Sequence, residues 1–87
     1  MKIKSGFYIK KTDNDTVIVC CDNPQKTISN IVLDEIAVFL WETLSQNDMG
    51  KEQLLNALLE RFDISTVLAL NDIDIFVKTL KENDILE

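Results

Sequence analysis

The stretch from Ile28 to Leu44, ISNIVLDEIAVFLWETL, places the strongest constraint on the fold. Its first part alternates apolar and polar residues as a strand does, and its second part is apolar on nearly all sides, as a buried helix is. The change falls between Leu33 and Asp34, where an apolar residue precedes a side chain suited to capping a helix. Strand-like patterns precede this point and helical spacing follows it. We therefore expect strands first and helices second.

Three strands are predicted before the junction. The first covers Phe7 to Lys11 and the second covers Thr16 to Cys21, with Asn and Asp residues between them that favour a turn. Pro24 interrupts the pattern because it cannot donate to a sheet ladder. The third strand covers Thr27 to Leu33. Hairpin-like connections predict an antiparallel sheet in which the third strand forms an edge.

Three helices are predicted after the junction of strand and helix patterns, over Asp34 to Leu44, about Lys51 to Phe62, and about Thr66 to Glu82. The first helix is apolar enough to be central, and Trp41 is interpreted as a core residue. The apolar stripe of this helix is Ile36, Ala37, Leu40, Trp41 and Leu44. The inner stripe of the last helix is Ala69, Ile73, Phe76, Val77 and Leu80. Ile75 lies off that stripe, so we expect it to be partly exposed.

Strands that precede helices, rather than alternate with them, predict an α+β fold. Three short helices with tight turns and a small sheet resemble a winged helix-turn-helix. A chain of 87 residues with 46% hydrophobic residues can build one small core, so we expect residues 1–87 to form a single domain.

Charge and missing residue types argue against several functions. The net charge of −6 disfavours nucleic-acid binding, which needs clustered Lys and Arg. The chain has no histidine, the commonest general base and metal ligand, and Gly6 and Gly50 stand alone rather than in a phosphate-binding loop. We infer no enzyme activity, no catalytic residues, no metal and no cofactor.

The adjacent Cys20 and Cys21 lack the spacing of a zinc or redox motif, and a disulfide between neighbours is strained. We interpret them as small apolar strand residues in a reducing compartment, the alternative being an exposed reactive thiol. No apolar run approaches the roughly 18–20 residues of a membrane span, and the N-terminus lacks the apolar core of a signal peptide. We therefore expect a cytoplasmic protein without a membrane partner.

Three segments in register resemble the PqqD-like family, over about residues 7 to 87. Residues 32–44, VLDEIAVFLWETL, resemble its "LN-x-x-A-x-x-IW-x-x-L" signature. Leu54, Leu58 and Phe62-Asp63-Ile64 match its second helix, and Asp72-Ile73, Phe76, Leu80 and Ile85-Leu86 match its "D-[VI]-x-x-F-[LI]-x-x-L" pattern and terminal apolar pair. Asp34 replaces the usual Asn. Asn83-Asp84 replaces a usual Gly, so the last turn is expected to close differently.

The resemblance implies a recognition element for ribosomally made, modified peptides. Such a domain binds the leader segment of a precursor peptide as a strand added beside the third strand and against the third helix. It acts as a peptide chaperone in natural product biosynthesis and presents the core to another protein. With no fused enzyme domain, that partner is expected in trans, as a leader peptidase of lasso-peptide type or a radical-SAM enzyme of pyrroloquinoline quinone or thioether-peptide type.

The residues support one part of this hypothesis directly. An edge strand leaves backbone N–H and C=O groups unpaired, as strand addition requires. Ser29, Ile31 and Leu33 should share one face of it, and Ile28, Asn30 and Val32 the other. The predicted peptide-binding residues are Ile28, Ser29, Asn30, Ile31, Val32, Leu33, Asp72, Ile75, Phe76 and Thr79. Asp72, Lys78 or Glu82 would add polar selectivity. For Ile31 and Phe76, the alternative is ordinary core packing.

Other interpretations stay open. A small winged helix-turn-helix DNA-binding regulator would need a basic recognition helix, whereas the third helix carries Asp72, Asp74 and Glu82 against Lys78 and Lys81. A purely structural subunit of a larger enzyme would bind that enzyme but no leader. An open strand edge could also pair two copies into a homodimer when no peptide is present.

Overall fold

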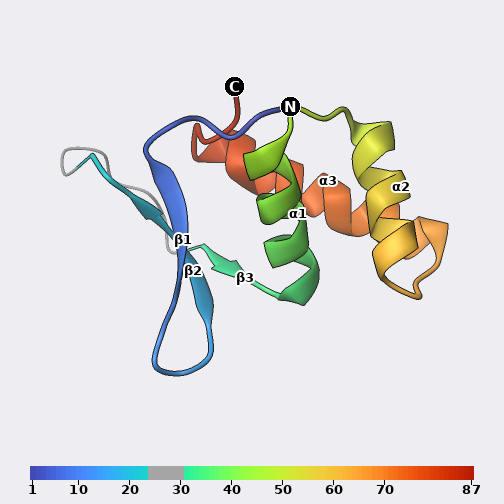
Figure 1. Ribbon diagram of the computed structural model, residues 1–87, viewed down its shortest axis with the longest axis horizontal. Coiled ribbons are helices and arrows are strands. Elements are labelled where there is room, and N and C mark those ends of the chain that lie inside the picture. The colour runs from blue at the N-terminus through green and yellow to red at the C-terminus, as the bar shows by residue number, and fades with distance from the viewer. Residues whose placement is uncertain (24–30) are drawn as a thin grey trace.

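The computed structural model describes residues 1–23 and 31–87, and in it strands precede helices (Figure 1). The strands β1 (Phe7–Lys11), β2 (Val17–Cys21) and β3 (Val32–Leu33) form an antiparallel sheet in the order β1-β2-β3. The helices α1 (Glu35–Gln46), α2 (Lys51–Arg61) and α3 (Thr66–Glu82) follow. The predicted α+β fold, a three-stranded antiparallel sheet followed by three helices, is confirmed.

The third strand is the element whose predicted bounds differ from the structure. It was predicted from Thr27, whereas β3 begins at Val32, and the part of the prediction that covers Ile28, Ser29 and Asn30 lies outside the described residues. Contact with β2 starts slightly earlier, because the N–H of Val19 donates to the C=O of Ile31 at 3.1 Å. The described part of this edge therefore runs over Ile31 to Leu33.

Helix α1 is the centre of the molecule. Asp34 caps it as predicted, since its carboxylate accepts the N–H of Ala37 at 2.8 Å. The sheet lies on one side of α1 and α2 on the other, while α3 passes across it (Figure 1). Leu40, Trp41 and Leu44 are buried, and the exposed fraction of Trp41 is 3%, which confirms it as a core residue.

Helix α3 supplies the other half of the core. The Ser65 side chain accepts the N–H of Leu68 at 3.2 Å and so fixes where the helix begins. Its buried residues are Ala69, Ile73, Phe76 and Leu80, and Val77, the other member of the predicted stripe, is only partly buried. Ile75 lies off this stripe and is 57% exposed, which confirms the expectation of partial exposure. One face of α3 thus holds the core while an adjoining face keeps apolar surface in solvent.

The end of α3 closes in the way glycine usually allows, although no glycine is present. Asp84 adopts a left-handed φ of 57°. Its N–H donates to the C=O of Lys81, and the N–H of Ile85 donates to the C=O of Leu80. These two bonds are the Schellman pattern, so the expectation of a different closure is wrong. Aspartate substitutes because its short polar side chain tolerates this conformation. The closure turns Ile85 into the core, where it is fully buried.

Asp84→Ala should lower the free energy of unfolding by about 1 kcal/mol, because alanine bears the full steric cost of the left-handed conformation. Asp84→Asn should stay within about 0.5 kcal/mol of the unsubstituted protein, since asparagine tolerates this conformation and an exposed ion pair such as that with Lys4 contributes little. Urea unfolding of both variants provides the measurement. Equal losses for the two variants would show that the ion pair, not the backbone, matters here.

Candidate functional site

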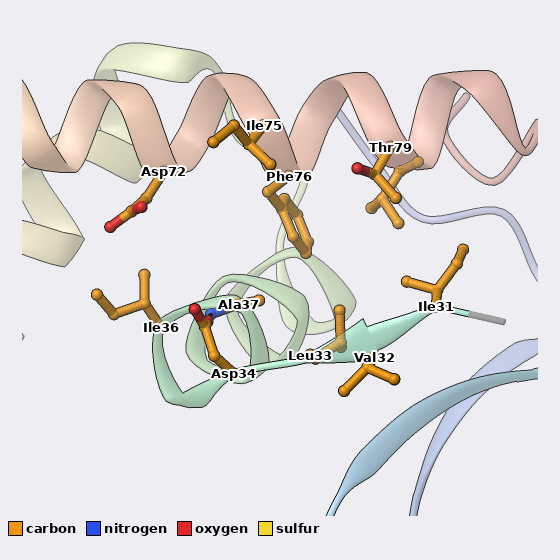
Figure 2. A pocket seen from close by; sticks show the side chains of 11 residues that line it. Ile31, Val32, Leu33, Asp34, Ile36, Ala37, Asp72, Ile75, Phe76 and Thr79 are labelled. Atoms are coloured by element: carbon orange, nitrogen blue, oxygen red, sulfur yellow. Dashed lines mark hydrogen bonds between the residues drawn. The ribbon is translucent and has the colours of Figure 1, made fainter.

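A groove of about 320 Å³ lies between β3 and α3 and reaches the first turn of α1 (Figure 2). Ile31, Val32 and Leu33 line it from the strand side, Asp72, Ile75, Phe76, Thr79 and Leu80 from α3, and Asp34, Ile36 and Ala37 from the start of α1. Most of these side chains are apolar. Segments far apart in the sequence thus form one trough beside the end of the sheet.

Every described residue of the predicted site lines this groove, namely Ile31, Val32, Leu33, Asp72, Ile75, Phe76 and Thr79. Ile28, Ser29 and Asn30 lie outside the described residues. Lys78 and Glu82, named as alternatives to Asp72 for polar selectivity, do not line it. They lie on another face of α3, around a second hollow with Lys51 and Asp74.

The contribution of α1 to the groove was missed. Ile36 and Ala37 were assigned to the core stripe of the helix, and Asp34 only to its cap. All three are less than fully buried and line one end of the groove. The available signal was their position directly after the edge strand, because a helix that begins without a linker must place its first turn beside that edge.

The backbone of β3 presents hydrogen-bonding groups on the side away from β2. In an antiparallel ladder, successive residues direct their N–H and C=O groups toward opposite neighbours. The C=O of Ile31 is bonded to Val19 on β2, so the N–H and C=O of Val32 point to the opposite edge. Among the described residues no strand pairs with that edge. The groove is therefore bordered by one donor and one acceptor able to bind another strand.

The side chains of the groove divide into a buried floor and an exposed rim. Ile31 and Leu33 point toward α3, and Phe76 points down toward them (Figure 2). All three are buried, and the exposed fraction of Phe76 is 4%. Val32 points away from α3 and is 63% exposed, which confirms the predicted alternation of faces over Ile31 to Leu33. With the exposed Ile75 on α3, it supplies apolar surface that the fold itself does not cover.

The cysteines lie outside the groove, on β2. Both are free and half-buried. Cys20 lies opposite Tyr8 on β1, and its electrostatic interaction with Tyr8, more than burial or Asp22, raises the pKa of the Tyr8 phenol above its ordinary value of 10.0.

Two further kinds of feature are absent from the described residues. No group of three or more His, Cys, Asp and Glu side chains within residues 1–23 and 31–87 could hold a metal ion. No helix formed by these residues is both long and apolar enough to cross a membrane.

Comparison with known proteins connects this groove to a family. Residues 19–86, which include every residue that lines the groove, match the family model described as coenzyme PQQ synthesis protein D (PqqD). The chain belongs to the PqqD family. The resemblance noted from the three helical segments is thereby confirmed. No curated protein matches this PqqD-family chain.

A solved structure shares the fold of this PqqD-family chain. It is described as TbiB1 in complex with the TbiA(beta) leader peptide, and it superposes with a TM-score of 0.73 over 100% of this chain and 95% of TbiB1. The two sequences are 20% identical. The likeness shows that the arrangement of sheet and helices is common to both proteins.

Phe76→Ala should lower the free energy of unfolding by about 3 kcal/mol, because it opens a cavity in the core. Ile75→Ala should change it by less than about 1 kcal/mol, since the side chain is exposed and alanine favours the helix. Urea unfolding of the two variants compares neighbouring positions on one helix. A loss at Ile75 as large as that at Phe76 would contradict the division into rim and floor.

Proposed function

We propose that this chain binds the leader segment of a ribosomally synthesised precursor peptide by adding it as a strand beside β3. The observation that carries this proposal is the groove that joins the open edge of β3 to exposed apolar surface on α3. Membership of the PqqD family and a shared fold with TbiB1, whose structure contains a leader peptide, support it.

Strand addition uses the groups that the fold leaves over. The leader backbone bonds to the N–H and C=O of Val32, which point away from β2. Alternate leader side chains then face α3 and cover Ile75, while those between them lie beside the Val32 side chain. The backbone bonds form with any leader sequence and supply general affinity. Burying the exposed isoleucine contributes about 1–2 kcal/mol and depends on the leader side chain, so the α3 face supplies selection.

Recognition rather than catalysis is the role that we assign to residues 1–87, taken as one peptide-recognition domain in the cytoplasm. The sequence contains no histidine to act as a general base. The chain acts as a peptide chaperone that presents the bound precursor to a modifying enzyme or leader peptidase in trans. The pathway is of lasso-peptide or radical-SAM type.

The charge of α3 favours a peptide over the alternative of a DNA regulator. The acidic Asp72 of α3 lies in the groove. The basic Lys78 follows the acidic Asp74 by one turn on the same helix, so opposite charges alternate there. The whole chain carries a net charge of −6, so a phosphate backbone would be repelled rather than attracted. We therefore assign no nucleic-acid partner.

The same open edge allows two copies to pair when peptide is absent, which would make a homodimer that competes with the leader. Sedimentation should show dimers that dissociate into peptide-bound monomers when leader is added. A monomer under both conditions would remove the dimer from the proposal without affecting peptide binding.

Titration with a synthetic peptide that carries the leader sequence of the cognate precursor tests the proposed function. Ile75→Glu should weaken binding about tenfold or more, because a carboxylate replaces apolar contact area in the groove. Val67→Glu is the matched control, since Val67 is 76% exposed on the same helix and does not line the groove. It should bind like the unsubstituted protein.

Backbone amide shifts recorded during the same titration locate the site. The largest changes should fall on β3 and along the groove-facing side of α3. Perturbed amides that avoid both elements would contradict the proposed site, as would equal losses of affinity for the two glutamate variants.

A further inference from the structure

The groove carries charge of a single sign, and that charge is gathered at one end. Its ionisable lining residues are Asp34 and Asp72. Both lie toward the end marked by Ile36, whereas Ile31 and Thr79 lie toward the other end (Figure 2). An extended occupant would therefore meet carboxylates at one end of its path and apolar or hydroxyl groups along the rest.

Asp72 lies in the groove without a counter-charge among the described residues. It is half-buried and forms no ion pair with any described residue. On the same helix, by contrast, Asp74 pairs with Lys51 at 2.5 Å and Glu82 lies 4.0 Å from Lys78. The acids of α3 outside the groove thus have partners, and the one inside it has none among the described residues.

Asp34 adds to this negative end although it also caps α1. One of its oxygens accepts the N–H of Ala37, and Glu35 follows in the first turn. A helix N-terminus carries about half a positive charge, so the carboxylates of Asp34 and Glu35 more than offset it. The formal charge at this end of the groove is therefore negative.

Filling the groove would remove water from Asp72. Removing water from a carboxylate costs free energy unless a cation or hydrogen-bond donor replaces that water. An apolar or acidic neighbour would therefore weaken binding, whereas an ammonium or guanidinium group would form a charge-assisted hydrogen bond.

We propose that the peptide bound in this groove carries a Lys or Arg that pairs with Asp72. This inference rests on the proposed function and specifies the chemistry of its ligand. A strand added antiparallel to β3 begins near Asp34 and Asp72, because β3 itself runs from Ile31 toward Asp34. The basic residue thus lies on the N-terminal side of the apolar residue that covers Ile75.

Selection from a phage-displayed library of random peptides tests the inference and does not require that the leader sequence be known. The unsubstituted protein should enrich peptides with Lys or Arg shortly before an apolar, strand-forming segment. Asp72→Asn should lose the basic preference and keep the apolar one. Asp74→Asn is the matched control, because it removes an acid from the same helix outside the groove, and it should select as the unsubstituted protein does.

Affinity measurements on one selected peptide then identify the pair. Replacing its basic residue by Gln should weaken binding about fivefold to the unsubstituted protein and have little effect on Asp72→Asn. Asp34→Asn keeps a capping side chain, so it tests the second carboxylate with α1 intact; it should weaken binding of the basic peptide less than Asp72→Asn does.

The outcomes separate the inference from the function on which it rests. Enrichment of apolar peptides with no basic preference would overturn the pairing with Asp72 and leave strand addition in place. A basic preference that persists in Asp72→Asn would also overturn it. Failure of the folded, unsubstituted protein to enrich any peptide would overturn the proposed function and this inference together.

Discussion

The hydrogen bond between the Asp34 carboxylate and the Ala37 N–H is the interaction on which the groove depends. It starts α1 directly after β3, with no linker between them. Leu33, buried just before the cap, ties the strand to the core. The orientation of the strand edge is thereby fixed against α1. Packing of α1 on α3 fixes the same edge against α3, the wall of the groove opposite β3. A looser junction would leave the walls without a defined separation.

Stability and recognition are assigned to neighbouring residues of the same elements. On α3, Phe76 completes the core while Ile75 lies in solvent. On β3, Leu33 is buried while Val32 is exposed, because successive strand residues alternate between faces. Substitutions of the rim residues Val32 and Ile75 should therefore change the free energy of unfolding little, because the buried residues beneath them are retained. This separation is what a domain that recognises peptides needs.

Local signals predicted most of the fold. Asp34 and Ser65 are capping residues followed by helical apolar spacing, so α1 and α3 begin where expected. The exposure of Ile75 followed from its angle on the helix. The wall that Ile36 and Ala37 contribute was not predicted, because it depends on how α1 is oriented against α3. The closure at Asp84 was also missed, since family usage suggested glycine while the left-handed conformation requires only a tolerant side chain.

Amide hydrogen exchange at Val32 tests the central claim, that a leader strand adds to the open edge of β3, most directly. The register directs this N–H away from β2, whereas the backbone of Ile31 is already bonded to Val19. With saturating leader peptide, exchange at Val32 should slow strongly, because its N–H then donates to the added strand. Unchanged exchange at Val32, while the peptide is bound, would contradict strand addition at this edge.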